Sequence, residues 1–434
     1  MNKLIMMIGA AAVAVGACAD TVTTNGVTWT FTASGSNATL GDGTDPCIAK
    51  DTSVDAANIP WTFTKDGIDY TVTAIAANAF KACSGLSGTL TIPDAVTSMG
   101  DAAFYTCHAL SRIESLGGVT SLPDEAFRMS SKGLSQLPGS DYPDMSRIVT
   151  IGKNVFNYSR MGGTVRLDAL AGYSNCDAVF QNAAITNVVF PRSGFNLSGN
   201  NMFNGCTGLK GVYVPGPDES GAALIRRSNC FKGCTSLKVF LVGPRTWIST
   251  NYGSSDTTMF DGVTGCLIFV PAGAAANGAG WDDLEDYVSD NVITHYGSGL
   301  ELDLSFDHDA KTITATPATA YALTNVLNAA SIFKSEFGYD TRITMTNAIE
   351  VAEGTITDAM LSGVAFESLI FNVKTQAQLD MVLAATAEVS IPLCIDPTGA
   401  KAEMTLPADR KVWVLLSGTG KYRPKIKGLI ITFL

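Results

Sequence analysis

The chain has 434 residues, of which 46% are hydrophobic and 16% are charged, and its formal net charge is -11. This amount of apolar sequence predicts a folded protein of two or three domains and excludes a disordered tail. The sequence pI near 4.8 argues against nucleic acid or an anionic membrane surface as partner, because both need concentrated Lys and Arg.

Residues 1–19 have the features of an export signal. Lys3 supplies a positive start, an apolar run follows over 4–15, and the Ala-Cys-Ala sequence at 17–19 fits the small-residue cleavage pattern. We therefore expect cleavage before Asp20 and an exported protein, either secreted or held at the cell surface. No later apolar run reaches the roughly 18 residues that a membrane-spanning helix requires.

An alternative places a lipid anchor at the same end. The Val-Gly-Ala-Cys sequence at 15–18 resembles a bacterial lipoprotein box, which would make Cys18 a lipidated amino terminus. Simple cleavage is favoured, because the small residues at 17–19 satisfy the cleavage pattern in full.

Residues 20–72 predict an N-terminal β cap. Polar and apolar residues alternate along this segment, and Asn25-Gly26 and Asp66-Gly67 are typical hairpin turns. Two hairpins here would cover the apolar end of the repeats that follow.

Over 73–296 a short motif built around phenylalanine returns eight times, at steps of 23 to 29 residues. Recurrence at such a period predicts a solenoid, here of about eight coils, with one long core and two broad exposed flanks. A compact residue lies three positions after each Phe, a Leu commonly lies six or seven positions after it, and a β-branched stretch then ends at Pro, which cannot donate to a β ladder. The anchors are Phe80, Phe104, Phe127, Phe156, Phe180, Phe203, Phe231 and Phe260; the compact residues include Cys83, Cys107, Cys206 and Cys234; the leucines are Leu86, Leu110, Leu134, Leu209, Leu237 and Leu267.

The cysteines are interpreted as packing residues. Their repeat position is shared with Ser and Ala, so we expect it to require small volume, filled by buried free thiols. Disulfides are the alternative in an exported chain, either between Cys206 and Cys234 in neighbouring coils or between Cys230 and Cys234. A metal site at Cys230 and Cys234 lacks a second ligand pair at the usual spacing.

The motif resembles the BspA-like bacterial leucine-rich repeats, whose units read Ile-x-x-x-Ala-Phe-x-x-Cys-x-x-Leu before a strand that ends in Pro. The segments IAANAFKACSGL at 75–86, MGDAAFYTCHAL at 99–110 and NMFNGCTGL at 201–209 carry the match. The apolar residue five positions before Phe is kept in the first four coils and drifts afterwards. The resemblance covers half of the chain and implies a secreted or cell-surface bacterial protein that acts in adhesion or protein binding.

Residues 297–434 predict a separate C-terminal α/β or α+β module of unknown family. Strands are expected at 311–316, 342–346, 368–373, 389–393, 412–416 and 429–433, and helices at 320–337, 357–361 and 376–387. The whole chain is thus predicted to be mostly β with some α.

Few residues suggest chemistry. His108 is read as a solvated or packed turn residue, Asp307-His308-Asp309 as a turn and only alternatively as a metal site, and the acidic run at 281–286 as a solvated helical turn more than a calcium site. His295 is the third histidine of the chain and belongs to no motif. No phosphate loop, dinucleotide fingerprint, nucleophile elbow or zinc-protease motif is present, so we predict no enzyme, no cofactor and no metal.

The leading hypothesis is therefore a repeat protein that binds a macromolecule, protein or glycan, through the solenoid surface. Tyr105, Arg226, Arg227 and Trp247 are the candidate contact residues, since Tyr, Trp and Arg dominate interface energetics. Two alternatives remain: an enzyme whose activity lies in the C-terminal module, and a structural spacer or envelope component.

Overall fold

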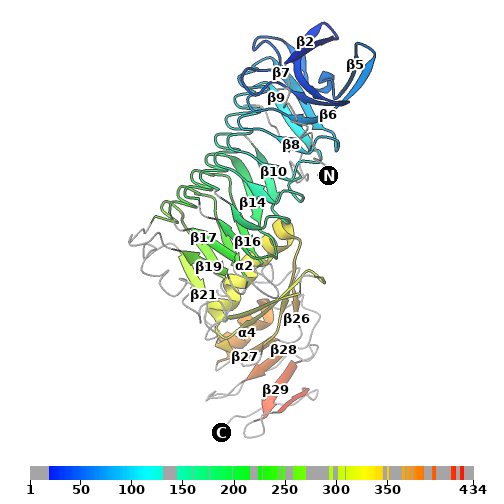
Figure 1. Cartoon of the computed structure of the whole chain (residues 1–434). Coiled ribbons are helices and arrows are strands. Elements are labelled where there is room, and N and C mark those ends of the chain that lie inside the picture. Colours follow the sequence, from blue (N-terminus) through cyan, green and yellow to red (C-terminus); the bar gives the residue numbers. More distant parts are fainter. Residues whose placement is uncertain are drawn as a thin grey trace, which may run out of the picture.

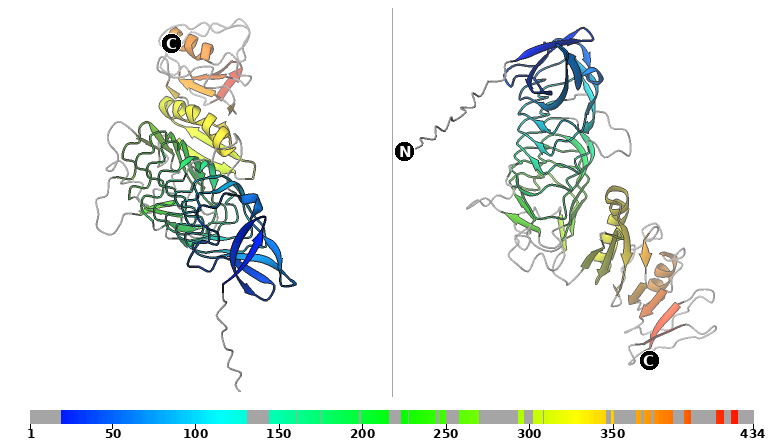
Figure 2. Two further views of the ribbon diagram at one scale, coloured as in Figure 1. Left: turned by 90° about the horizontal axis from the view of Figure 1, so that it is seen from above. Right: turned by 45° about the vertical axis from the view of Figure 1, so that its right-hand side comes forward.

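The protein is described by a computed structural model. It is mostly β with two α-helices among the described residues, as the sequence predicts, and none of the described helices has the length and apolar character to cross a membrane (Figures 1 and 2). The described residues are 19–130, 144–159, 161–174, 176–197, 199–215, 223–226, 228–243, 246–249, 258–269, 293–296, 302–307, 309–345, 349–350, 364–366, 369–372, 375–385, 393–396, 412–416 and 421–424.

The chain begins with a five-stranded path β1-β2-β3-β6-β5. Both expected hairpins are confirmed: β1 turns into β2 at Asn25 and Gly26, and β5 turns into β6 at Asp66 and Gly67, with positive φ at all four residues. The bounds are β1 (Asp20–Thr24), β2 (Val27–Ser34), β3 (Asn37–Leu40), β5 (Thr62–Lys65) and β6 (Ile68–Ile75).

Aromatic packing curls this sheet and joins it to the repeats. Phe31 contacts Phe63 edge-on at a centroid distance of 4.7 Å, and Lys65 on edge strand β5 forms an ion pair with Asp20 on the opposite edge strand β1. Trp29 is fully buried and meets the ring of Phe80 at 6.4 Å. The same hydrophobic core therefore runs from the sheet into the first repeat.

The eight repeat phenylalanines form one continuous stack. Their rings are buried, neighbouring centroids lie 4.8 to 5.6 Å apart, and the ring planes deviate from parallel by 3 to 14°. Offset parallel stacking of this kind adds to the free energy gained by burial. We number the coils 1 to 8 by these residues, from Phe80 to Phe260.

Each phenylalanine lies in a turn that hydrogen-bonds to the next turn. The Phe80 N–H donates to the Ala103 carbonyl at 2.7 Å, and the equivalent bond from Phe104 to Ala126 is 2.8 Å. The residues two before and two after each Phe adopt left-handed backbone angles in nearly every described turn. Two left-handed residues flanking one Phe are therefore the local geometry that makes the turn.

Strands follow the turns on two sides of the solenoid. The first flank comes directly after the Leu position and consists of β7 (Leu86–Ile92), β9 (Leu110–Leu116), β12 (Gly162–Arg166), β14 (Ala184–Val189), β16 (Gly211–Val214), β18 (Val239–Val242), β20 (Cys266–Phe269) and β21 (Ile293–Tyr296), preceded by β4 (Val54–Asp55) and the short helix η1 (Ala56–Asn58). The second flank consists of β8 (Ser98–Met99), β10 (Ser121–Leu122), β11 (Thr150–Ile151), β13 (Gly172–Ser174), β15 (Phe195–Leu197), β17 (Ala223–Arg226) and β19 (Thr246–Ser249). Leu134 lies outside the described residues.

Beyond the repeats the chain forms two further sheets and two helices. Helix α2 (Ala320–Phe337) has the expected range; Thr319 caps its start by accepting from the Ala322 N–H at 3.1 Å, and Gly338 ends it at φ 75°. The remaining elements are β22 (Leu302–Asp307), β23 (Thr312–Pro317), β24 (Asp340–Ile343), β25 (Ile349–Glu350), β26 (Ala365–Phe366), β27 (Leu369–Asn372), α4 (Gln376–Ala385), β28 (Leu393–Asp396), β29 (Val412–Leu416) and β30 (Lys421–Pro424).

Five of these elements differ from the expectation. β28 begins where the predicted strand 389–393 was to end, and β22, β25, β26 and β30 were not predicted. β22 and β30 pair antiparallel with β23 and β29, whereas the two-residue strands β25 and β26 pair parallel with β27 and β24, so pairing partners and not local pattern define these four strands. The predicted helix 357–361 and strand 429–433 lie outside the described residues.

Candidate interaction surface

The cysteine position carries a hydrogen bond as well as a small side chain. The thiols of Cys107, Cys206 and Cys234 lie 3.0, 2.9 and 3.1 Å from the carbonyl oxygen of the Phe in the preceding coil. Ser130 occupies the same position in coil 3, and its hydroxyl donates to the equivalent carbonyl, that of Phe104. The prediction of small volume without regard to polarity was therefore incomplete, because the position favours a compact donor. Ala183 and Val263 fill it without donating.

All cysteines whose side chains are described are buried free thiols, including Cys206, Cys230 and Cys234, so the disulfide alternatives are not formed. Burial raises the pKa of Cys83 to about 11 and that of Cys234 to about 12. A thiol held protonated by an apolar environment is a weak nucleophile. These groups consequently stabilise the coil stack and offer no reactive site.

The side chains directly after each Phe form a row along the turns. Tyr105 in coil 2 lies between two cations: Lys81 Nζ of coil 1 is 5.6 Å from its ring centroid, and Arg128 Cζ of coil 3 is 5.8 Å from it. Arg128 also pairs with Glu125 of its own turn. The predicted contact residue Tyr105 is thus half-buried and held by its neighbours.

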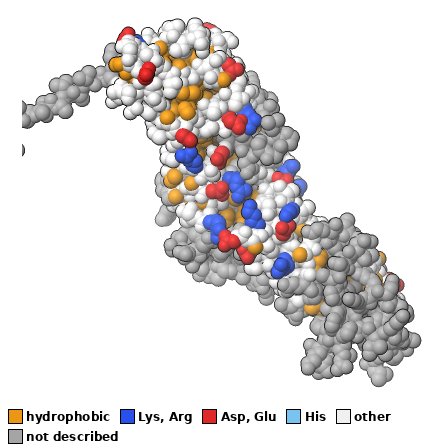
Figure 3. Space-filling model, turned by 90° about the vertical axis from the view of Figure 1, so that its right-hand side faces the viewer, with side chains coloured by type: hydrophobic (Ala, Val, Ile, Leu, Met, Phe, Trp, Pro, Cys, Tyr) orange, Lys and Arg blue, Asp and Glu red, His pale blue; other side chains and the backbone are white. Residues whose placement is uncertain are grey.

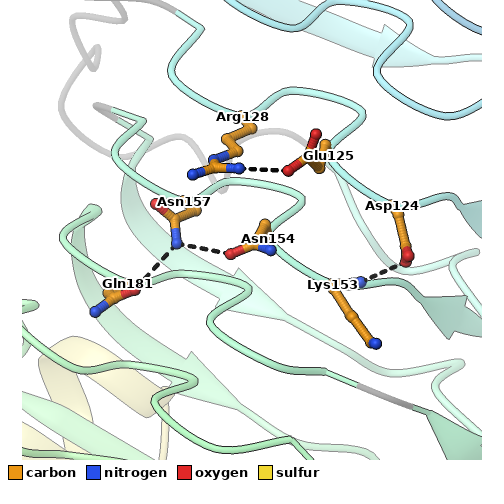
Figure 4. Close-up of polar contacts among 7 residues, drawn as sticks. All are labelled: Asp124, Glu125, Arg128, Lys153, Asn154, Asn157 and Gln181. Atoms are coloured by element: carbon orange, nitrogen blue, oxygen red, sulfur yellow. Dashed lines mark hydrogen bonds and ion pairs between the residues drawn. The ribbon is translucent and has the colours of Figure 1, made fainter.

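Further along this row, amides replace the cations. The Asn157 Nδ2 donates to Asn154 Oδ1 at 2.9 Å and to Gln181 Oε1 at 3.1 Å, while Asn157 Oδ1 is buried without a partner (Figure 4). Only 3% of Asn157 is exposed. An amide oxygen buried without a donor is unusual and marks this turn for attention.

The next row contains the left-handed residues two positions after each Phe. In coils 6 to 8 these are glycines, but coils 3 and 4 carry Met129 at φ 51° and Tyr158 at φ 55°. Left-handed backbone costs such residues about 1–2 kcal/mol each. Burial does not offset this cost, because Met129 is 37% and Tyr158 is 58% exposed. We call residues one and two positions after each Phe the turn ridge.

The first flank changes character along its length. In β7 and β9 the inward residues are apolar, and the outward ones are Ser, Thr, Arg and Glu, with Arg112 and Glu114 paired at 2.8 Å. In β16 and β18 every residue is buried: Val212 and Val214 face the solenoid core, whereas Tyr213 and Leu241 belong to a second core outside it. The late strands of this flank are therefore apolar on both faces.

Helix α2 covers those outward apolar residues. Phe333 contacts Phe269 edge-on at 5.5 Å, and Phe337 contacts Tyr213 at the same centroid distance. Figure 1 shows α2 lying along the late coils, beside β16. The expectation of two broad exposed flanks was therefore wrong for this part of the first flank, because the chain buries it with its own helix.

Polar contacts fix the same junction. Asn187 of β14 donates to the Glu336 carboxylate, and the Tyr213 hydroxyl lies 3.5 Å from that of Tyr339. A Cβ added at Gly211 would lie 2.7 Å from Phe337 Cζ, so the glycine gives the helix room to approach.

Leu267 is a further correction. It was assigned to the Leu position of coil 8, but it packs outward against the second core, and Cys266 is the buried residue that faces the solenoid interior. The phenylalanine spacing is kept, and the inward position comes six residues after Phe260. In coil 8 the inward position is therefore Cys266, one residue before the predicted Leu267.

The remaining predicted contact residues lie on the second flank or beyond the described residues. Arg226 is the last residue of β17 and pairs with Ser249, and Trp247 of β19 pairs with Leu224; only their backbones are described. Arg227 lies outside the described residues. The structure therefore does not bring Tyr105 together with these three.

The other candidate groups form no chemical site among the described residues. Asp307 accepts from the N–H groups of Asp309 and Ala310 at 3.1 and 2.8 Å, which makes the expected turn before Lys311. Within the described part of the chain no three His, Cys, Asp or Glu side chains gather as metal ligands. His108 is half-buried in a turn and His295 lies in β21, whereas His308 and 281–286 lie outside the described residues.

Charged side chains of both signs are interspersed along the face shown in Figure 3. Ion pairs such as Lys232 with Asp261, at 3.0 Å, connect neighbouring turns. Nucleic-acid binding would need a field of one positive sign. The net charge of -11 and the mixed charges on this face do not form a positive field.

Comparisons with known proteins identify the repeats. A family model described as "BspA type Leucine rich repeat region" matches residues 62–169 and 145–251, in six copies. No curated protein matches the chain.

Several solved structures are similar in part. A leucine rich cell surface protein from Faecalibacterium prausnitzii is 14% identical, with a TM-score of 0.34, over 80% of this chain and 97% of that one. A leucine-rich repeat protein from Bacteroides ovatus is 14% identical, with a TM-score of 0.27, over 59% and 82%. The pneumococcal vaccine antigen PcpA is 12% identical, with a TM-score of 0.22, over 64% and 98%. The part of the chain that the phenylalanine stack holds together is therefore, over residues 62–251, a BspA-type leucine-rich repeat region.

Proposed function

We propose that the protein is exported and binds a macromolecular partner, a protein or a glycan, through the surface of its repeats. The observation that carries this proposal is the unbroken phenylalanine stack, because it fixes successive turns in register and so presents their side chains in straight rows. Such a surface is broad and rigid, and a rigid surface loses little conformational entropy when it binds. The match of the repeats to a leucine-rich repeat family supports the same role by analogy.

The two hydrophobic cores suit a chain of three parts after the export signal. We propose a cap over 20–72, repeats over 73–296 and a C-terminal module over 297–434. The module covers the late part of the first flank through α2. The surfaces left for a partner are the turn ridge, the early part of the first flank and the second flank.

Export by simple cleavage is compatible with the start of the fold. Strand β1 begins at Asp20, so cleavage before this residue would leave the whole N-terminal sheet intact. A lipid on Cys18, the alternative, would hold this sheet close to a membrane. Secretion and surface attachment both remain within the proposal.

We propose no catalytic role and no cofactor. The described part of the C-terminal module directs the side chains of Phe333, Phe337 and Phe371 into the second core. A module filled in this way is suited to closing the apolar flank of the repeats.

The test uses the full mature chain, 20–434. A fragment without α2 would expose Tyr213, Leu241 and Phe269 and would bind apolar surfaces nonspecifically. The chain is screened against panels of purified extracellular proteins and glycans. Three variants then probe the three surfaces: Lys81→Glu on the turn ridge, Thr91→Arg on the first flank and Ser98→Arg on the second flank. Asn328→Arg on the exposed face of α2 is the control.

The proposal predicts that at least one repeat variant weakens the binding by about tenfold and that the control leaves it within about twofold. Absence of any retained partner across both panels would contradict the proposal. Loss of binding in Asn328→Arg alone would transfer the function to the C-terminal module.

A further inference from the structure

Two bulky residues on the turn ridge keep an unfavourable backbone geometry without being buried. Met129 and Tyr158 occupy equivalent positions in coils 3 and 4, and the Met129 N–H donates to the Asn157 carbonyl at 2.8 Å, so the two residues lie in adjacent turns. The same left-handed position holds Ala82, Thr106 and Asn182 in coils 1, 2 and 5 and glycine in coils 6 to 8, because hydrogen bonds to the next coil impose it. Coils 3 and 4 differ in placing two large exposed side chains there, and adjacent exposed apolar side chains are a reason to look for a partner.

The neighbouring row adds a cation with spare donors. Arg128 precedes Met129 and gives its Nη1 to Glu125, while its Nε–H has no acceptor. In the next turn, the buried Asn157 Oδ1 has no donor. Figure 4 shows this oxygen on the side of Asn157 that faces Arg128. Both of these atoms are buried beside the two exposed residues, so the part of Arg128 that a partner could reach is the outer part of its guanidinium.

These features fit a polypeptide better than a glycan. Met129 offers a flexible apolar surface and no strong hydrogen-bonding group, and Met, Tyr and Arg are all enriched in protein interfaces. A peptide can present an apolar side chain next to a carboxylate, and these two groups would meet the exposed Met129 and Tyr158 and the part-exposed guanidinium of Arg128. A neutral glycan has no charged group to pair with that guanidinium.

We propose that Met129 and Tyr158, with Arg128 beside them, form the contact site for a protein partner that presents an apolar side chain next to a carboxylate. The apolar side chain packs between Met129 and Tyr158. The carboxylate pairs with the guanidinium, which Tyr105 holds in place. This inference rests on the proposed function and specifies where on the repeats the partner binds and what it presents.

The probe is an array of synthetic 12-residue peptides in which one aromatic or aliphatic residue and one Asp or Glu occupy every relative spacing. A matched array carries Asn or Gln in place of the acid, and a panel of neutral glycans is run alongside. The full mature chain is compared with the double variant Met129→Gly/Tyr158→Gly, with Arg128→Gln and with Asn182→Gly. Asn182 has the same left-handed position in coil 5, at φ 57°, and serves as the control.

The wild-type chain is expected to retain acidic apolar peptides. The double variant should bind them about tenfold more weakly, Arg128→Gln should bind them no better than it binds their amide versions, and the control should stay within about twofold of wild type. The double variant should also melt no lower than wild type, because glycine relieves the strain. Reduced binding with undiminished stability separates loss of contact from loss of fold.

Unchanged binding by the double variant would overturn the contact site and leave the proposed function standing. Retention of neutral glycans alone would overturn the assignment of a protein partner. If the wild-type chain retained nothing from the peptide arrays, the contact site would be overturned, and the proposed function would be decided by the panels of purified proteins and glycans.

Discussion

The Cys206 thiol donates to the carbonyl oxygen of Phe180 in the preceding coil, at an Sγ–O distance of 2.9 Å. The same carbonyl also accepts the Ala183 N–H of its own turn, at 2.9 Å. One residue type thus fills a small space and ties two coils together, which explains why Cys recurs at this position and why Ser130 can replace it.

This relationship gives a prediction for substitutions at Cys206. Cys206→Ser should lower the free energy of unfolding by less than about 0.5 kcal/mol, whereas Cys206→Ala should lower it by about 1–2 kcal/mol, because Ala loses the hydrogen bond and part of the packing. Denaturant unfolding of the full chain measures both. Equal stability of the two variants would show that volume alone matters at this position.

The raised thiol pKa values predict slow chemical modification. At pH 8 the native chain should react negligibly with iodoacetamide at Cys83 and Cys234, whose pKa values burial raises to about 11 and about 12. The same residues should react fully after denaturation. Peptide mass spectrometry of both samples counts the labels, and rapid labelling of the native coils would mean that they are open.

The same shifts predict alkaline instability. A thiol that stays protonated in the fold but ionises in the unfolded chain stabilises the fold fully below the unfolded pKa, near 9. This contribution is lost as pH rises through the folded value of about 11 for Cys83. The free energy of unfolding should therefore fall over this window, and the decrease should be smaller in Cys83→Ser. An identical alkaline profile in this variant would assign the decrease to other groups.

Gly211 controls the approach of α2. In Gly211→Ala the new Cβ would lie 2.7 Å from Phe337 Cζ and 3.0 Å from Asn187 Oδ1, so the helix should shift or detach. Binding of an apolar dye should rise because Tyr213 and Leu241 become accessible.

Gly208→Ala is the matched control, since its nearest neighbour would be the Ile185 carbonyl oxygen at 3.4 Å, an ordinary contact. Equal dye binding by the two variants would contradict the role assigned to Gly211.

Several parts of this structure were predictable from sequence. The spacing of the phenylalanines indicated a stack of turns, because a core residue that recurs once per coil must meet its equivalent in the next coil. Asn25-Gly26 and Asp66-Gly67 specified their hairpins through the left-handed angles that these residues tolerate. Helix α2 was predictable from the composition and spacing of residues 320–337.

The covering of the first flank was not predicted, although the sequence contains a signal for it. Residues 211–214, 239–242 and 266–269 read as nearly continuous apolar runs, whereas 86–92 and 110–116 mix apolar with polar residues. An unbroken apolar strand is buried on both faces. The pattern therefore indicates that something covers these strands, but it does not identify α2 as the cover.

No sequence pattern predicted the left-handed backbone along the turn ridge. Ala82, Thr106, Met129 and Tyr158 all take left-handed angles, although none of these residue types favours them. The stack imposes one turn geometry on every coil, and only the later coils use Gly to meet it. Local propensity could not reveal this because the hydrogen bonds to the next coil decide the conformation.

The N terminus of the mature protein is a simple and direct test of the export proposal. Intact-mass measurement of protein recovered from the producing cells should give a chain that starts at Asp20 without modification. A lipid-modified chain starting at Cys18 would contradict simple cleavage and place the repeats at a membrane.

If the repeats contact the partner and the C-terminal module does not, binding should protect the turns of the repeats from hydrogen exchange. Exchange of the full mature chain is measured alone and with a peptide retained from the array. We expect slower exchange at 104–106, 127–129 and 156–158 on binding, with no change in α2. Protection confined to 302–424, with the turns unaffected, would show that the module and not the repeats contacts the partner.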